Sequence, residues 1–215
     1  MDRRLKIKLI KQPPESDDCL RCCALMVFRY YKDNITKKEV WQKLHVYKKY
    51  SGLYGATFSD AARVALEIGY KATTLHYDWQ WWNQDVVRAS KHSKKELIDA
   101  LKRLKLKKRK WAIRKKVEKT IDFVRMGGKY KFKYPRLENI DLFLKKNIPV
   151  ILSVRAEELY QDPKEDYPHA ILIIGKQGNN YLLNDPYLAL SKISAEELYY
   201  SWVRNGGWMM AIYKP

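Results

Sequence analysis

The chain has 215 residues, of which 46% are hydrophobic and 13% aromatic. This composition supports one domain with a hydrophobic core and excludes global disorder. No apolar run approaches the roughly 20 residues that cross a bilayer, and no signal-peptide pattern is present, so a membrane or secreted protein is disfavoured. The three cysteines, Cys19, Cys22 and Cys23, lie too close together to join distant segments. A disulfide framework is therefore excluded, and a reducing, cytoplasmic compartment is expected.

The charge is concentrated in one part of the chain. The formal net charge is +19, yet the segment Arg88–Arg136 alone holds 20 basic and 4 acidic residues, whereas the rest holds 23 and 20. The pattern predicts a nearly neutral body with one basic insert. Three roles stay open for this insert: contact with a polyanion such as nucleic acid or an anionic membrane, attraction of an acidic peptide substrate, or a merely solvated helical face.

The first third of the chain predicts three helices and a strand. A helix that is apolar on most faces, and hence buried, begins near Cys19; Ser16, Asp17 and Asp18 are its N-cap candidates, after Pro13-Pro14. A capping box of Thr36 and Glu39 opens a short second helix. The remaining expected elements are a loop at 51–57, a helix at 58–68 and a strand at 70–76.

The basic insert is expected to be mostly helical. A capping box of Ser93 and Glu96 opens a long basic helical stretch, straight or kinked, that ends at Gly127-Gly128. Lysines and aromatic residues then alternate over 129–134, which is typical of a strand with one solvated face. Three tryptophans precede the strongly basic segment Arg88–Arg136: Trp79, Trp81 and Trp82. Two roles stay open for them, lining a groove or packing against the insert.

The last third predicts mainly strands. In chain order we expect a helix at 137–146, a strand at 150–154, an acidic loop at 157–168, strands at 170–174 and 180–184, a helix at 194–203 and a strand at 208–213. Ser194 and Glu197 form a third capping box at the start of that helix. Helices come first and a mostly antiparallel sheet comes last, which favours the α+β class.

Four residues together suggest thiol chemistry. Cys19 lies at a helix N-terminus, where the helix dipole favours a thiolate. A cysteine nucleophile needs a base and a group that orients the base; His169 opens one strand and Asp185 ends the next, so an antiparallel pairing brings them together. Gln12 precedes Cys19 by seven residues, and its amide is able to donate to a developing oxyanion.

Each of these residues taken alone has a plainer explanation, so the argument depends on their combination and order. Cys22 and Cys23 are expected to be structural, and Cys23 shares a helix face with Cys19 and should be buried. A zinc site at Cys19 and Cys22 lacks a second Cys/His pair to complete four ligands.

Two segments resemble the C39-type peptidases, which are papain-like, bacteriocin-processing (double-glycine leader) cysteine peptidases, and their stand-alone relatives. The first contains Gln12, Asp18-Cys19, Cys23 and an apolar helix that ends in Tyr30-Tyr31. The second runs from Pro168-His169 through Asp185-Pro186 to Trp202. Together with the intervening helix and strand, the resemblance covers roughly residues 8–76 and 136–213.

The resemblance implies one papain-like domain over residues 1–215, interrupted by the basic, mostly helical insert at about 77–135. It implies that Cys19 is the nucleophile, His169 the general base and acid, Asp185 the group that orients the imidazole, and Gln12 part of the oxyanion hole. It implies no cofactor and no metal.

Two classes of function follow. The first is a cytoplasmic thiol hydrolase that cleaves a peptide or amide bond in a peptide or protein substrate through a thioester acyl-enzyme; acyl transfer to an amine is an open variant. The alternative is a catalytically inactive papain-like scaffold that binds nucleic acid or another polyanion through the insert. Leu20 motivates this alternative, because the family usually has Gly directly after the nucleophile. The substrate and the oligomeric state are not predicted.

Overall fold

The computed structural model describes residues 2–32, 34–47, 55–78, 81 and 83–215. Trp79, Trp82 and most of the loop predicted at 51–57 lie outside the described residues. The helices are α1 (Cys19–Tyr30), α2 (Lys37–Lys43), α3 (Phe58–Glu67), α4 (Gln84–Ala89), α5 (Lys94–Lys107), α6 (Trp111–Arg125), α7 (Leu137–Leu144), α8 (Ala156–Tyr160) and α9 (Ala195–Arg204). The strands are β1 (Arg3–Arg4), β2 (Lys71–His76), β3 (Lys129–Phe132), β4 (Val150–Arg155), β5 (Pro168–Gln177), β6 (Asn180–Asn184), β7 (Lys192–Ser194) and β8 (Met209–Tyr213).

The described strands form one sheet in the order β3-β2-β8-β4-β5-β6-β7, with β1 paired to β5. Among these pairings β2 and β3 run parallel, and the others are antiparallel. The α+β class with a mostly antiparallel sheet, predicted from the order of the elements, is confirmed.

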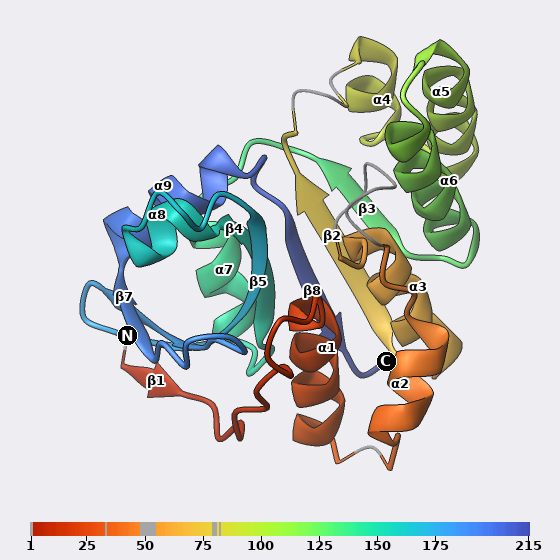
Figure 1. Cartoon of the computed structure of the whole chain (residues 1–215). Coiled ribbons are helices and arrows are strands. Elements are labelled where there is room, and N and C mark those ends of the chain that lie inside the picture. Colours follow the sequence, from red (N-terminus) through yellow and green to blue (C-terminus); the bar gives the residue numbers. More distant parts are fainter. Residues whose placement is uncertain (1, 33, 48–54, 79–80, 82) are drawn as a thin grey trace.

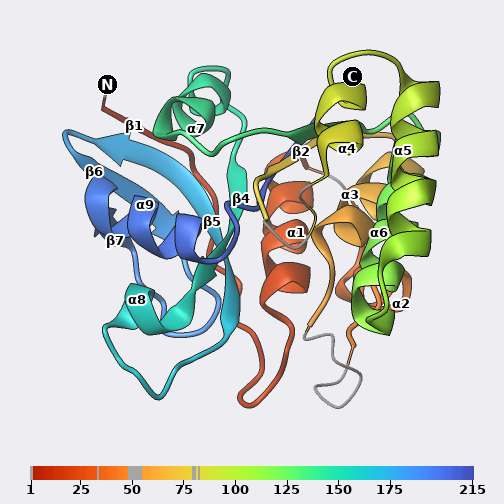
Figure 2. The same cartoon turned by 90° about the horizontal axis from the view of Figure 1, so that it is seen from above.

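Helix α1 lies between two halves of the molecule (Figures 1 and 2). On one side is the strand-rich half with β4 to β7, and on the other is the helical half with α2 to α6 (Figure 2). Helix α1 contacts β5, and α3 contacts β2 and β8. The apolar residues of both halves join in one hydrophobic core around α1.

The central helix begins at the predicted residue. Eight of the twelve residues of α1 are buried, as expected of a helix that is apolar on most faces. Asp18 is the N-cap residue, but its side chain does not cap the helix. Its carboxylate instead accepts hydrogen bonds from Arg21 Nη1 (2.9 Å) and Trp41 Nε1 (3.0 Å), which connects the start of α1 to α2.

The basic insert differs from the expected long helical stretch, for which a kink was left open, because the stretch is broken into two helices. It contains α4 and a hairpin of two helices, α5 and α6, joined by residues 108–110. The hairpin is antiparallel, because Lys94 Nζ at the start of α5 donates to the carbonyl of Arg125 at the end of α6 (2.6 Å). The break falls where Lys107 to Lys110 offer no apolar side chain to the core, and it lets the apolar faces of both helices be buried. These faces comprise Leu97, Ala100, Leu101, Leu104, Val117, Ile121, Phe123 and Val124.

Other local predictions are mostly confirmed. The capping boxes at Thr36/Glu39 and Ser194/Glu197 are both present, and Ser93 accepts a hydrogen bond from the Glu96 backbone N–H. The predicted acidic loop at 157–168 is wrong at both ends. Residues up to Tyr160 belong to the short helix α8, and Pro168 already pairs with β4.

No helix in the described part of the chain combines the length and apolar character that a membrane span requires.

Candidate active site

A cleft of about 780 Å³ brings together residues from both halves of the molecule. Gln12, Cys19 and His169, three of the four residues singled out by the sequence, line it. The fourth, Asp185, is fully buried and hydrogen-bonded to His169. The structure therefore brings all four residues to one place, although His169 is 150 residues from Cys19.

Cys19 is the one cysteine that lines the cleft among the described residues. It is half-buried, whereas Cys22 and Cys23 are fully buried. Burial, together with the nearby Asp18 carboxylate, raises the pKa of Cys22 to about 12. Burial also raises the pKa of Cys23 well above its usual value, and its thiol donates to the Ala170 carbonyl (3.4 Å). The predicted structural role of Cys22 and Cys23 agrees with this packing, and Cys19 is left as the accessible thiol.

His169 and Asp185 form a buried pair. In the antiparallel pairing of β5 with β6, Leu172 lies opposite Asn184, so the start of β5 reaches the residue that follows β6. His169 Nε2 and Asp185 Oδ1 are 2.7 Å apart. This contact engages one ring nitrogen, and the His169 ring lines the same cleft as Cys19.

The charge on His169 follows from these contacts. Burial by itself lowers the pKa of His169, but the hydrogen bonds with Asp185 and Cys19 outweigh it and raise the pKa to about 9. The imidazole therefore carries a proton at neutral pH.

The Asp185 carboxylate is held by the turn that it opens. Burial alone would raise its pKa, but hydrogen bonding to His169 and to neighbouring donors holds the pKa below its usual value. Tyr160 of α8 donates its hydroxyl proton to Oδ2 (3.0 Å). Three backbone N–H groups after the predicted Asp-Pro turn also donate: Tyr187 (2.9 Å), Leu188 (3.1 Å) and Leu190 (3.4 Å).

Gln12 is anchored next to this turn. Its backbone N–H donates to the Pro186 carbonyl (2.9 Å), and its side-chain Nε2 donates to the Ser16 carbonyl (2.8 Å). Its Oε1 is buried and has no hydrogen-bond partner among the described residues. A carboxamide nitrogen carries two N–H groups, so Gln12 has one more donor to offer than the contact with Ser16 uses. The first N–H groups of α1 lie nearby in the chain, and the Asp18 side chain caps none of them.

Sequence reasoning missed several residues that line the cleft or contact Asp185. Tyr160 sits in a segment expected to be loop, and Lys116 was one of many insert lysines. Ser153 and Asn205 line the cleft and hydrogen-bond to each other (2.6 Å), but neither belongs to a motif. Of the tryptophans with two open roles, Trp81 is both buried and part of the cleft wall.

An aromatic wall closes one side of the cleft. Phe58, Trp81 and Trp208 line it, and Trp208 stacks on His76 with ring centroids 3.7 Å apart and an interplanar angle of 5°. The Nε2 atom of His76 lies 2.6 Å from the Tyr130 hydroxyl, and burial lowers its pKa well below the usual value. His76 is therefore neutral, and it packs within the aromatic wall.

No group of three or more His, Cys, Asp or Glu side chains that could hold a metal ion occurs within the described ranges.

Comparisons with known proteins agree on the fold. No protein-family model and no curated protein sequence matches the chain. Among solved structures, a double-glycine-motif protease from an AMS/PCAT transporter, in complex with its leader peptide, has a TM-score of 0.52 at 16% identity and covers 99% of this chain and 94% of that chain.

Two further structures are similar to this chain. A Bacillus anthracis protein assigned to the C39-like peptidases has a TM-score of 0.55 at 14% identity and covers 100% and 99% of the two chains. The peptidase domain of Streptococcus ComA, a bifunctional ABC transporter of a quorum-sensing pathway, has a TM-score of 0.50 at 14% identity and covers 97% and 99%. The architecture expected from the sequence resemblance is therefore confirmed.

Proposed function

We propose that this chain, whose fold is that of the C39-like peptidases, is a cysteine peptidase that cleaves a peptide or amide bond. The observation that supports the proposal is that His169, which is hydrogen-bonded to the buried Asp185, lines the same cleft as the half-buried Cys19. This is the relation that a thiol nucleophile needs with its base and with the group that orients the base.

The first half of the reaction forms a thioester. At neutral pH the Cys19 proton already resides on His169, so that the two residues form a thiolate–imidazolium pair. The Sγ thiolate attacks the carbonyl carbon of the scissile bond. The carbonyl electrons move onto oxygen, and the oxyanion is stabilised by the Gln12 carboxamide and by the uncapped N–H groups of the α1 N-terminus. His169 then gives its proton to the leaving amine as the C–N bond breaks.

The second half of the reaction hydrolyses the thioester and releases the carboxylic acid product. His169, neutral after giving its proton to the amine, removes a proton from a water molecule as the water oxygen attacks the thioester carbon. The C–S bond then breaks and returns the Cys19 thiolate beside the protonated His169. Asp185 keeps the imidazole in one orientation throughout and stabilises its cationic form. An amine in place of water would give acyl transfer by the same steps.

We propose a peptide segment as the substrate. The protease from the AMS/PCAT transporter, which shares the fold, binds a leader peptide. The cleft of this chain is of the size range of ligand sites, about 300 to 1,000 Å³, and it combines an apolar aromatic wall with polar groups. A cytoplasmic location stays a prediction.

Leu20, which motivates the inactive-scaffold alternative, does not cover the thiol. Its side chain is 2% exposed and packs into the hydrophobic core, although it also lines the cleft. Cys19 stays partly exposed beside it. The proposal therefore keeps a reactive Cys19, and the alternative becomes an outcome of the experiment.

The test is labelling with a peptidyl chloromethyl ketone, with the modified residue identified by mass spectrometry. We expect the native protein to be labelled at Cys19. Labelling should be lost in Cys19→Ala and at least about 100-fold slower in His169→Ala, because a positioned general base contributes 10²–10⁴-fold. Cys22→Ala is the matched control, and it should be labelled like the native protein because Cys22 is buried.

Equal labelling rates in the native protein and in His169→Ala would refute the peptidase proposal and favour the scaffold. Incubating a peptide library with the native protein in H₂¹⁸O separates the two variants of the reaction. Hydrolysis places one ¹⁸O in each new C-terminal carboxylate, whereas acyl transfer to an amine places none.

A further inference from the structure

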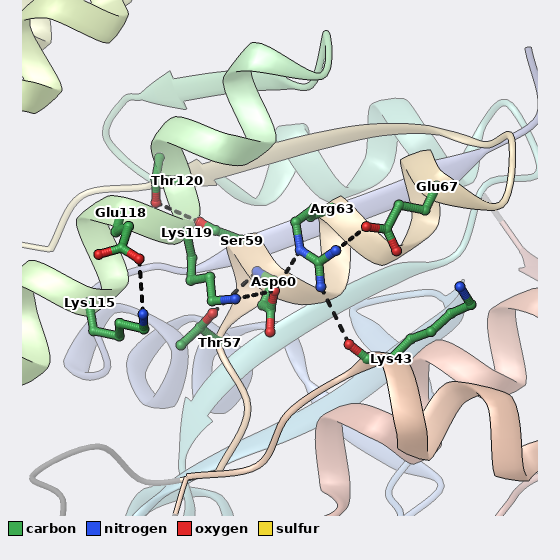
Figure 3. Close-up of polar contacts among 10 residues, drawn as sticks. All are labelled: Lys43, Thr57, Ser59, Asp60, Arg63, Glu67, Lys115, Glu118, Lys119 and Thr120. Carbon is green, nitrogen blue, oxygen red and sulfur yellow. Dashed lines mark hydrogen bonds and ion pairs between the residues drawn. The ribbon is translucent and has the colours of Figure 1, made fainter.

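The insert reaches into the cleft through helix α6. Figure 3 shows how α6 is fixed on α3: the Ser59 and Thr120 hydroxyls lie 2.7 Å apart, and Lys119 Nζ lies 3.3 Å from Asp60 Oδ1. Lys116 lies one helical turn before Thr120, whose hydroxyl donates to the Lys116 carbonyl (3.1 Å). Residues four apart share a helix face, so the contacts that fix α6 on α3 also direct Lys116 to the cleft, which it lines.

The two lysines that flank Lys116 on the surface of α6 each form an ion pair. Lys115 pairs with Glu118 (2.9 Å), and Lys119 pairs with Asp60 (3.3 Å), as Figure 3 shows. Within the described part of the chain, Lys116 makes no ion pair and no side-chain hydrogen bond. Its two neighbours are therefore neutralised locally, whereas the charge of Lys116 faces the cleft.

Burial makes the positive charge of Lys116 energetically unfavourable. Burial lowers the pKa of Lys116, and the Asp78 carboxylate partly opposes the effect from a distance. Lys116 also acts electrostatically on the buried His76 ring, which stacks on Trp208 in the aromatic wall. A charge near low-polarity walls interacts more strongly with an opposite charge than it would in water. A carboxylate that enters the cleft would thus be attracted to Lys116.

The other cations of the cleft are differently placed. Arg155 pairs with Asp166, and Lys164 is exposed at the rim. Three basic side chains of the described residues line the cleft: Lys116, Arg155 and Lys164. Among these three, Lys116 alone is half-buried and forms no ion pair within the described part of the chain.

We propose that Lys116 forms a subsite for a carboxylate of the substrate, so that the insert makes the cleft select peptides with a carboxylate at a fixed distance from the scissile bond. This inference rests on the proposed peptidase function. The carboxylate belongs either to an acidic side chain or to the C-terminus of the peptide.

The test measures how fast Cys19 is alkylated by N-bromoacetyl peptides. The probes are bromoacetyl-(Ala)n-Glu-Ala-amide with n from 0 to 3, the same peptides with Gln, and Gln peptides with a free C-terminal carboxylate. At one spacing we expect the carboxylate probe to react about tenfold faster than its neutral partner, which corresponds to about 1.4 kcal/mol. Preference for the Glu probes indicates a side-chain carboxylate, and preference for the free-acid probes indicates the C-terminus.

The variants assign the effect to one residue. In Lys116→Gln the preference should disappear, and in Lys116→Glu it should reverse. Arg114→Glu is the matched control: Arg114 lies on the same helix and is exposed, and it does not line the cleft. This variant changes the net charge by the same amount as Lys116→Glu. It should keep the preference for the carboxylate probe, except for any contribution from long-range attraction, which added salt screens.

Equal rates for charged and neutral probes at every spacing, or equal loss of preference in Lys116→Glu and Arg114→Glu, would overturn the subsite. Failure of the peptidase proposal looks different. Cys19 would then react no faster than a cysteine of the unfolded chain with any probe, while the ratio between charged and neutral probes would still report on Lys116.

Discussion

His169 shows how one side chain acquires its properties from contacts made by distant parts of the chain. It opens a strand, as the sequence predicts, but its protonation depends on the buried Asp185 and on Cys19. Without these two partners, burial alone would make the imidazole neutral, since desolvation disfavours its charged form.

We expect an NMR titration of the His169 ring to give an apparent pKa of about 9 in the native protein. The pKa should fall in Asp185→Asn and, separately, in Cys19→Ser, because each change replaces a partner whose negative charge favours the imidazolium by a neutral side chain. His169→Gln assigns the signal among the four histidines. A pKa that stays near 9 in Asp185→Asn would contradict the proposed role of the carboxylate.

The same shift couples stability to pH. The pKa of His169 is higher in the folded chain than the ordinary value of 6.5. Protonation therefore stabilises the folded state fully below about pH 6.5, and this contribution is lost as the pH rises through about 9. The proposed thiolate–imidazolium pair would be lost over the same range, because His169 is then neutral.

At the scale of whole elements, the packing of α6 on α3 also depends on a contact between residues that are distant in the sequence. Both hydroxyls of the Ser59–Thr120 bond are buried. The Thr120 proton is used by the Lys116 carbonyl, so Ser59 is the donor to Thr120. The two residues are therefore not equivalent, although they share one hydrogen bond.

We expect Thr120→Val to lower the free energy of unfolding by about 1–3 kcal/mol, because it leaves the buried Ser59 hydroxyl without an acceptor. Ser59→Ala should cost less, about 0.5–1 kcal/mol, because Thr120 keeps its bond to Lys116. Urea unfolding of both variants measures the difference. The double variant should lose less free energy of unfolding than the two single variants together. A larger loss of this free energy in Ser59→Ala than in Thr120→Val would show that the donor assignment is wrong.

At the scale of the whole molecule, the uneven charge acts on stability. Three of the exposed positive charges of the insert lie close together at the turn between α5 and α6: Lys107, Arg109 and Lys110. Like charges at this spacing repel one another, and salt screens the repulsion. Contact of this surface with a polyanion, which the sequence leaves open, stays a prediction.

We expect the melting temperature to rise between 0.02 M and 0.5 M NaCl. Replacing the three residues of the turn by Gln should stabilise the protein at low salt by less than about 1 kcal/mol and reduce the salt-dependent rise. Calorimetry at both salt concentrations measures this change.

The control variant replaces three exposed lysines of the nearly neutral body by Gln: Lys6, Lys8 and Lys11. It lowers the net charge equally and should have a smaller effect. The same stabilisation in both variants would show that total charge matters rather than its concentration in the insert.

The sequence by itself determined what depends on neighbouring residues. The start of α1 at Cys19, the capping boxes, the antiparallel strands that carry His169 and Asp185, and the separation of charge all follow from local patterns. Propensity, capping and hydrophobic periodicity act over one or two turns of chain, so they can be recognised without the tertiary structure.

The tertiary structure alone decided the contacts that cross long stretches of chain. The hydroxyl of Tyr160 on Asp185, the stacking of Trp208 on His76 and the entry of Lys116 into the cleft have no local signal. One lysine among the 20 basic residues of the insert cannot be told from the others by its neighbours in sequence. Only the packing of α6 on α3 separates it from them, because burial and ion pairing are properties of the assembled surfaces.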